Sequence, residues 1–257
     1  MQSRIERIKA CLNGGRLRDE HPAVPVTPEE SAVQAAAAVA AGAEALHLHP
    51  RGPGGAQSLR PDDVAAAVTA VRRACPGVPV GVTTGLWISD GDADRRLTTV
   101  AGWAALPSTA RPDFASVNVG EPGFAELAEV LRRAEVGVEA GVWSTADAHM
   151  LAAVRTPVTR ILVEVIDGSA ASAVATADAI LAALDDAGLS APRLLHGEEA
   201  TCWPLVAHAG RRGLPTRIGL EDTLVGPAGE PIADNADLVR RALTIWSAAV
   251  PPGGHEW

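Results

Sequence analysis

Cysteine and lysine are both scarce in this chain of 257 residues. The three cysteines, Cys11, Cys75 and Cys202, are too few and too scattered for a disulfide framework or a zinc ribbon. This composition fits a reducing compartment, and we predict a cytoplasmic protein. The single lysine, Lys9, begins the first predicted strand, away from the expected catalytic end, so a Schiff-base mechanism is not expected.

The sequence also lacks long apolar runs and an excess of positive charge. No N-terminal apolar stretch has the length of a signal peptide, and no run of about 20 strongly apolar residues could span a bilayer. The formal net charge is −9 at pH 7, whereas nucleic acids and anionic membrane surfaces recruit basic patches. We therefore predict no nucleic-acid partner and no membrane partner.

The pattern of hydrophobic residues, which make up 47% of the chain, predicts the fold. Short apolar runs rich in β-branched residues alternate with segments of 3.6-residue periodicity along the whole length. This alternation predicts parallel strands, and eight such units close a barrel. The length also fits, so we predict one (β/α)8 TIM barrel over residues 1–257. The predicted strands are Ile8–Leu12, Ala45–His49, Val78–Thr83, Phe114–Val119, Val136–Val142, Arg160–Ile166, Arg193–His196 and Thr216–Glu221.

Helix start signals support the alternation. Thr27-Pro28-Glu29-Glu30 supplies an N-cap, a proline at the first helical position and a glutamate at the third. Ser144 and Asp147 form a similar signal. The last helix is predicted over Asp234–Ala249, and the tail Pro251–Trp257 is predicted to be loosely ordered.

His47 and His49 are the most informative pair of residues. Side chains two apart on a strand point to the same face, so both imidazoles can converge on one point. Burying them without a partner would be costly, which favours a metal site. Glu221 closes the last strand and is the best third ligand, leaving a coordination position open. Zinc suits two nitrogens and one oxygen, although manganese, iron and cobalt accept the same donors.

Further polar residues lie at the strand ends, where active sites of this barrel assemble. Each also has a structural interpretation. Asn118 and Thr84 could cap the helices that follow. Glu139 and Glu164 could be buried partners of arginines, and His196 could be a hydrogen-bonded scaffold residue.

The chain resembles the β-keto acid cleavage enzymes, typified by 3-keto-5-aminohexanoate cleavage enzyme. That family consists of metal-dependent (β/α)8 barrels that condense a β-keto acid with acetyl-CoA and split it to acetoacetate and a new CoA thioester. The resemblance runs over most of the length. It rests on Asn13-Gly14-Gly15, Val26-Thr27-Pro28-Glu29-Glu30, His47-Leu48-His49-Pro50-Arg51, Thr83-Thr84-Gly85, Ser116-Val117-Asn118 and Arg217-Ile218-Gly219-Leu220-Glu221-Asp222.

The resemblance implies a role for each matching residue. His47, His49 and Glu221 become the zinc ligands. The acid–base and substrate-orienting groups become Asp222, Arg217 and Thr83, with Thr83 standing where some members have serine. Substrate contacts are expected from Asn13, Arg16, Thr84, Asn118 and Glu139.

Two departures from the family bear on the substrates. Arg16 stands where the aminohexanoate enzyme has a glutamate for the substrate's amino group, and Gly141 stands where a second acid is missing. A carboxylate or neutral tail is therefore expected on the substrate. Acidic residues follow strands six and seven, over 164–169 and 196–199, where they would repel the pyrophosphate of CoA. CoA as a cosubstrate and a reaction without CoA both stay open.

Three other functions are compatible with the same barrel. A metal-dependent aldolase or decarboxylase without CoA could use Glu164, His196 and Glu198 for acid–base work. A metal-dependent hydrolase would need further histidines at the ends of strands five and six, which the sequence lacks. A barrel that binds a metal or metabolite without turnover is the third. We also expect a homo-oligomer, a dimer or tetramer, with tryptophans such as Trp246 at its interfaces.

Overall fold

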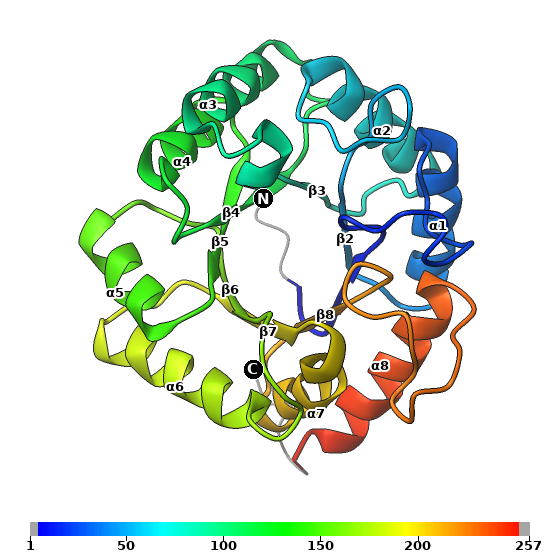
Figure 1. Cartoon of the computed structure of the whole chain (residues 1–257), viewed down its shortest axis with the longest axis vertical. Helices are drawn as coiled ribbons and strands as arrows, with labels where there is room; N and C mark the ends of the chain where they lie inside the picture. Colours follow the sequence, from blue (N-terminus) through cyan, green and yellow to red (C-terminus); the bar gives the residue numbers. More distant parts are fainter. Residues whose placement is uncertain (1–4, 252–257) are drawn as a thin grey trace.

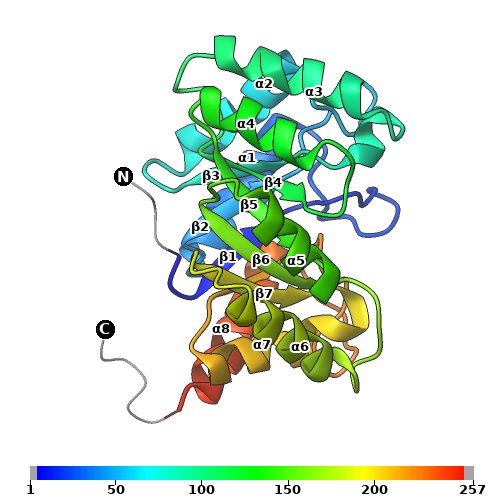
Figure 2. The same cartoon turned by 90° about the vertical axis from the view of Figure 1, so that its left-hand side faces the viewer.

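A computed structural model describes residues 5–251. Eight parallel strands form a ring, and eight α-helices surround it (Figure 1). The side view shows the helices packed along the outside of the strands (Figure 2). The predicted (β/α)8 barrel is therefore confirmed. The two ends of the predicted domain, residues 1–4 and 252–257, lie outside the described residues, and they include most of the predicted loose tail.

The strands follow one another around the ring in sequence order. The sheet order is β7-β6-β5-β4-β3-β2-β1-β8, which places β7 and β8 at its two edges. A backbone hydrogen bond from the Leu195 N–H to the Pro215 carbonyl, 3.0 Å long, joins these edges. The strands are β1 (Ile8–Cys11), β2 (Ala45–Leu48), β3 (Val80–Thr83), β4 (Phe114–Asn118), β5 (Gly137–Val142), β6 (Arg160–Val165), β7 (Arg193–Gly197) and β8 (Thr216–Ile218).

The helices begin where the sequence predicts them. Thr27 and Glu30 make the reciprocal hydrogen bonds of a capping box, and the Ser144 side chain accepts from the Asp147 N–H. Short 3₁₀ helices, η1 (Leu86–Ser89), η2 (Gly102–Ala105) and η3 (Glu199–Thr201), extend three of the loops. The α-helices are α1 (Pro28–Ala40), α2 (Pro61–Ala74), α3 (Ala93–Ala101), α4 (Phe124–Arg133), α5 (Thr145–Val154), α6 (Ala173–Asp186), α7 (Cys202–Arg212) and α8 (Asn235–Ala249).

The last strand is shorter than predicted. β8 ends at Ile218, whereas the sequence predicts a strand through Glu221. Gly219 packs so tightly on β1 that an added Cβ would lie 1.7 Å from the Cys11 carbonyl oxygen. The chain then turns, with the Asp222 N–H donating to the Gly219 carbonyl at 2.9 Å. Glu221 and Asp222 therefore stand on a turn above the barrel rather than on a strand.

The interior of the barrel is apolar at one end and charged in the middle. Ile5, Ala45, Phe114, Leu162 and Leu194 form a buried cluster. The larger core lies between the strands and the helices and includes Trp246, whose indole N–H donates to the Leu214 carbonyl at 2.8 Å. Because Trp246 is buried within the chain, the interface role predicted for it is wrong. No helix within residues 5–251 is long and apolar enough to cross a membrane.

Candidate active site

Two histidines and a glutamate meet at the C-terminal end of the barrel. His47 on β2 and His49 just after it point the same way, with ring centroids 5.3 Å apart. Glu221, from the turn after β8, lies between them: its Oε2 is 3.7 Å from His47 Nε2 and its Oε1 is 3.6 Å from His49 Nε2. One donor atom from each residue lies within 4.8 Å of the others, so the three side chains could hold one cation. We call these three residues the His-His-Glu triad.

Neighbouring side chains fix the orientation of the histidines. The Gln57 Oε1 lies 2.6 Å from His49 Nδ1, which leaves the Nε2 of that ring toward the triad. The Asn13 amide accepts from the His49 N–H at 2.8 Å and donates to the His49 carbonyl at 3.0 Å. Trp87 stacks on the His49 ring at 6.3 Å. Such outer contacts are typical of metal-ligating imidazoles. Asn13 therefore holds a histidine, and its predicted substrate contact stays a prediction.

The triad also contains buried polar atoms without a partner. Within the described residues, His47 Nδ1 and Glu221 Oε2 are buried and make no hydrogen bond. Burial lowers the pKa of His47 well below its usual value, so the ring is neutral and can act as a ligand. Arg217 and the two histidines outweigh burial at Glu221 and lower the pKa of this carboxyl group. Two imidazole nitrogens and one carboxylate oxygen are a donor set that zinc accepts.

Arg217 links the triad to a second carboxylate. Its Nε donates to Asp222 Oδ1 at 2.8 Å, and a terminal nitrogen lies 3.0 Å from Glu221 Oε1 and 3.2 Å from Glu198 Oε1. Asp222 is fully buried, and burial raises its pKa to about 7 against the opposing effect of Arg217. Burial likewise raises the pKa of Glu198 to about 8. Asp222 Oδ2 has no hydrogen-bonding partner within residues 5–251.

The predicted residues of β3 and β4 lie on the same end of the barrel. Thr83 Oγ1 accepts from the Gly85 N–H at 3.1 Å. Thr84 donates its hydroxyl to the Ser116 carbonyl at 2.6 Å, which is a scaffold contact between the strands. Asn118 donates to Glu121 Oε1 at 2.9 Å, and its amide oxygen accepts no hydrogen bond from the described residues.

Arg16 and Glu139, two of the residues predicted to contact the substrate, both form ion pairs with other side chains. Arg16 lies at the rim of the site and pairs with Glu20 at 3.1 Å and with Glu199. Its guanidinium thus contacts two carboxylates, and its predicted substrate contact stays a prediction. Glu139 lies inside the barrel, away from the triad, with Oε2 2.6 Å from Lys9 Nζ and Oε1 on Arg160. Both of its oxygens are occupied, which fits the structural alternative of a buried ion-pair partner rather than a substrate contact.

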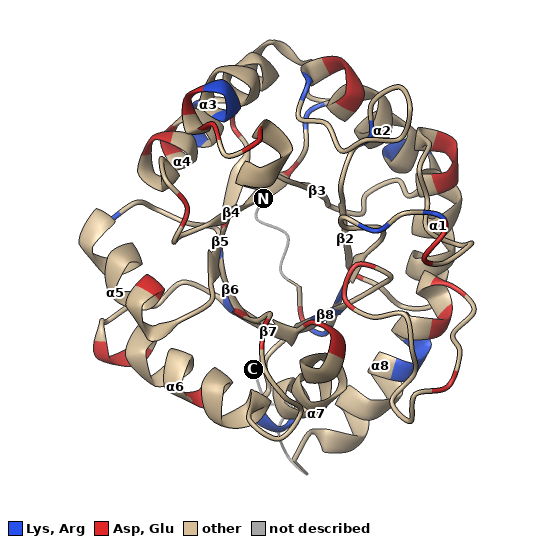
Figure 3. Cartoon of the chain, in the orientation of Figure 1, with Lys and Arg blue, Asp and Glu red and all other residues tan. Residues whose placement is uncertain are grey.

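Glu164 and His196 stand next to the predicted residues, although the sequence left their roles open. They are register partners on β6 and β7, with His196 Nε2 3.5 Å from Glu164 Oε2 and His196 Nδ1 3.9 Å from Asp222 Oδ1. The Trp143 indole N–H donates to Glu164 Oε2 at 3.2 Å. Figure 3 shows acidic residues, in red, in the segment that follows β7 at this end of the barrel. Their place at strand ends was the signal that could have assigned them to the site.

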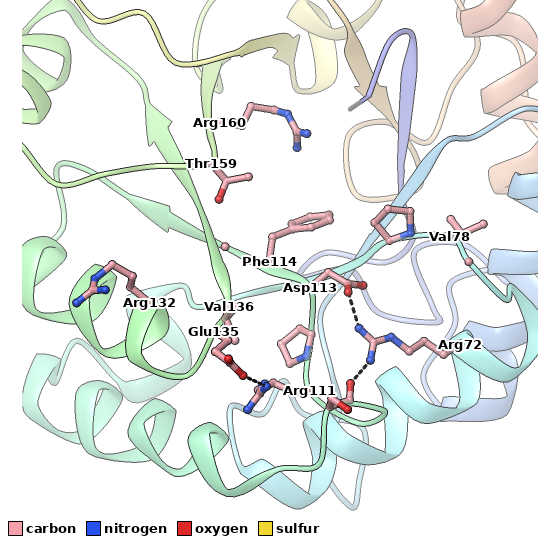
Figure 4. Close-up of a pocket in the computed structure, with 15 residues that line it drawn as sticks. Arg72, Val78, Arg111, Asp113, Phe114, Arg132, Glu135, Val136, Thr159 and Arg160 are labelled. Atoms are coloured by element: carbon pink, nitrogen blue, oxygen red, sulfur yellow. Dashed lines mark hydrogen bonds and ion pairs between the residues drawn. The ribbon is translucent and has the colours of Figure 1, made fainter. Parts of the chain in front are cut away.

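A separate cavity lies at the opposite end of the barrel. Its volume is about 930 Å³, and its walls come from the starts of β4, β5 and β6 and the loops before them (Figure 4). Arg72 and Arg111 line it, paired with Asp113 at 2.7 Å and Glu135 at 2.5 Å. None of the predicted site residues is among the described residues around it.

Comparison with known proteins assigns the chain to a family. The sequence model of the beta-keto acid cleavage enzyme family matches residues 7–250. A 3-keto-5-aminohexanoate cleavage enzyme from Fusobacterium nucleatum subsp. nucleatum is 31% identical over 118 residues, which are 46% of this chain and 40% of that protein. A 3-oxoadipate:acetyl-CoA acetyltransferase from Cupriavidus necator is 36% identical over 119 residues, 46% of this chain and 38% of that protein. The alignments thus span less than half the length of these curated relatives.

Solved structures agree on the fold. A binary complex of ObcA with oxaloacetate superposes with a TM-score of 0.67 at 17% identity, covering 85% of this chain and 62% of that one. The carboxyl transferase domain of Rhizobium etli pyruvate carboxylase, with pyruvate and biocytin, gives 0.60 at 15% identity and covers 96% and 48%. At these identities the likeness concerns the barrel alone. Because the family model matches nearly the whole sequence, the chain belongs to the beta-keto acid cleavage enzyme family.

Proposed function

We propose that this chain is a zinc-dependent β-keto acid cleavage enzyme that uses acetyl-CoA as its second substrate. The observation that carries the proposal is the His-His-Glu triad, with its donor atoms within 4.8 Å of one another beside Arg217 and Asp222. A bound divalent cation would act as a Lewis acid toward the keto and carboxylate oxygens of the substrate. Manganese, iron or cobalt would supply the same chemistry.

Asp222 is proposed to move the proton. Its Oδ1 is held by Arg217, while Oδ2 is free of partners within the described residues and can accept a proton from C2 of the β-keto acid. A bond then forms between C2 and the acetyl carbon of acetyl-CoA as the CoA thiolate leaves. The thiolate adds to the keto carbon, and the bond between C2 and this carbon breaks. The products are a new acyl-CoA and acetoacetate, with the proton returned to C2. Arg217 orients Asp222, and Thr83 is proposed to orient the substrate.

The charge pattern at the rim supports a role for CoA. From the sequence alone, Glu199 is one of the acidic residues expected to repel a pyrophosphate. In the structure, Arg16 pairs with this carboxylate. Burial raises the pKa of the neighbouring Glu198 to about 8, because desolvation favours the neutral carboxyl group. The mouth therefore carries less negative charge than the sequence suggests. One curated relative is named for acetyl-CoA, which agrees with this proposal.

The test is an incubation of zinc-loaded protein with a panel of β-keto acids, with and without acetyl-CoA. Mass spectrometry should detect acetoacetate and a new acyl-CoA only when acetyl-CoA is present. Product that forms equally without acetyl-CoA would instead identify a CoA-independent lyase, and no product under any condition would reject the enzyme function. The predicted dimer or tetramer is a separate proposal that light scattering on the purified protein would test, and the cytoplasmic location also stays a prediction.

A further inference from the structure

The wall of the barrel facing the His-His-Glu triad carries a group of acceptor atoms. The triad is held by β2 and by the turn after β8, on either side of β1. Figure 1 shows β5 across the ring from β2, with β4 and β6 beside it. A substrate bound at the triad would extend its acyl tail toward this wall.

Gly141 on β5 leaves room for two oxygens on that wall. A Cβ added to Gly141 would lie 2.8 Å from Asn118 Oδ1 on β4 and 2.8 Å from Glu164 Oε1 on β6. Both oxygens therefore approach the same bare stretch of strand. The Asn118 amide nitrogen donates to Glu121, which identifies the other amide atom as the acceptor.

Glu164 and His196 have hydrogen-bonding capacity that the described residues leave unused. Glu164 is 5% exposed; its Oε2 accepts from Trp143, and no hydrogen bond to Oε1 is made within residues 5–251. His196 is 1% exposed, and neither ring nitrogen has a hydrogen-bonding partner among those residues. Buried polar groups in native proteins are nearly always paired with protein, water or ligand. These atoms are therefore positioned to meet a polar group of a bound molecule.

Within residues 5–251, the cationic side chains around this wall already pair with carboxylates. Arg217 is occupied by Asp222, Glu221 and Glu198. Burial and then the charge of Arg217 lower the pKa of His196 to about 4, so its ring is neutral at physiological pH. A carboxylate placed here would meet Glu164 without a compensating charge.

We infer that Asn118, Glu164 and His196 bind the acyl tail of the β-keto acid, and that this tail ends in a hydrogen-bond donor, a hydroxyl or an ammonium group. The inference rests on the proposed function, because the triad is what anchors the other end of the substrate. Of the two tails expected from Arg16, a neutral hydroxyl tail agrees with this inference and a carboxylate tail does not. The Arg16 guanidinium pairs with Glu20 and Glu199.

Four β-keto acids of one chain length test this inference. They are 3-keto-5-aminohexanoate, its 5-hydroxy counterpart, unsubstituted 3-oxohexanoate, and 3-oxoadipate with a terminal carboxylate. Their dissociation constants would be measured by calorimetry on the zinc-loaded enzyme without acetyl-CoA, and kcat/KM with acetyl-CoA. We expect the amino or hydroxy acid to exceed 3-oxohexanoate by about tenfold or more in both, and 3-oxoadipate to be the weakest.

Variants distinguish a change in recognition of the substrate tail from a general loss of folding or activity. Glu164→Gln removes the charge but keeps the shape, so it should reduce an ammonium preference about tenfold and relieve the exclusion of 3-oxoadipate. Asn118→Asp adds a charge and should raise the preference for the amino acid over the hydroxy acid, which keeps the test valid if Glu164→Gln does not fold. Glu129→Gln, on the exposed face of α4, is the matched control and should change nothing.

The outcomes distinguish the two proposals. If the order of dissociation constants holds but no thioester forms, the proposed function fails and the tail site stands. If thioesters form but 3-oxoadipate is preferred, or if both variants leave the order unchanged, the tail site is rejected and the function stands. A preference confined to the ammonium or to the hydroxyl compound identifies which donor the site takes.

Discussion

Gly14 packs directly against Glu221. A Cβ on Gly14 would lie 2.5 Å from the Glu221 Cγ, and the Gly14 backbone has a φ of +50° that disfavours other residues. The first βα turn thus fixes the carboxylate of the His-His-Glu triad from below. Because the contact involves the root of the side chain, Glu221 cannot make room by rotating only its end.

Gly14→Ala should therefore weaken zinc binding. We expect a loss of about tenfold or more in zinc affinity, since displaced supporting contacts cost this much at other metal sites. Isothermal titration with a competing chelator would measure it. Gly213→Ala is the matched control, because Gly213 has a φ of +64° with nothing within 4 Å of an added Cβ. Both variants place alanine at a positive φ and should lose about 1 kcal/mol of stability, with a further loss in Gly14→Ala from the contact with Glu221. An equal loss of zinc affinity in both would contradict the role of Gly14.

Asp222→Asn should separate turnover from metal binding. The amide cannot take a proton from C2, so kcat should fall by about 100-fold or more, while the zinc content stays unchanged. His49→Ala should lose zinc and activity together, because it removes a triad donor atom. Elemental analysis and a thioester assay on the same samples would check both variants. Full activity in Asp222→Asn would show that another group moves the proton.

The buried ion pairs inside the barrel make a prediction about stability. Glu139 contacts both Lys9 and Arg160, and Glu139→Gln would leave two buried cations without this carboxylate. We expect the free energy of unfolding to drop by about 3–5 kcal/mol. Lys9→Met should cost less, because Glu139 keeps its contact with Arg160. Urea denaturation would compare them, and an equal or larger loss in Lys9→Met would contradict this view of the cluster.

The free energy of unfolding should depend on pH because of His196. Burial lowers its pKa to about 4 from an ordinary value of 6.5, so between these values the unfolded chain binds a proton that the folded chain does not. The free energy of unfolding should therefore fall as the pH drops from 6.5 to 4, by up to about 3 kcal/mol from this residue. His196→Gln should flatten that slope, whereas His149→Gln, exposed on α5, should not. Denaturant unfolding at several pH values would decide, and an unchanged slope in His196→Gln would refute the assignment.

The fold and the triad could be predicted because each depends on a short-range signal. Alternating apolar runs predict the strands, and the two-residue spacing of His47 and His49 predicts a shared face. Glu221 follows from its place at the end of the last strand, even though that strand stops at Ile218. The order of strands in a barrel then brings these distant residues together.

The rest of the site depends on contacts that no periodicity encodes. Arg16 and Glu199 are 183 residues apart and meet only because the first and seventh loops fold over the same rim. Gln57 reaches His49 because the loop after β2 turns back in a bridge between Arg51 and Gln57. For Glu139 the sequence allowed both a substrate contact and an ion pair, and only the inward packing of Lys9 distinguishes them.

The ring of strands is closed differently between β7 and β8 than elsewhere. Near the starts of these two strands, the edges share the Leu195–Pro215 hydrogen bond. In the loops after the strands, the Glu199 N–H donates to the Asp222 carbonyl at 2.7 Å, and Arg217 donates to Glu198. The groups proposed to handle the substrate thus also fasten the circumference of the barrel. A change at Arg217 would loosen this joint as well as the chemistry, so amide exchange along β8 should be measured before any lost activity is assigned to catalysis alone.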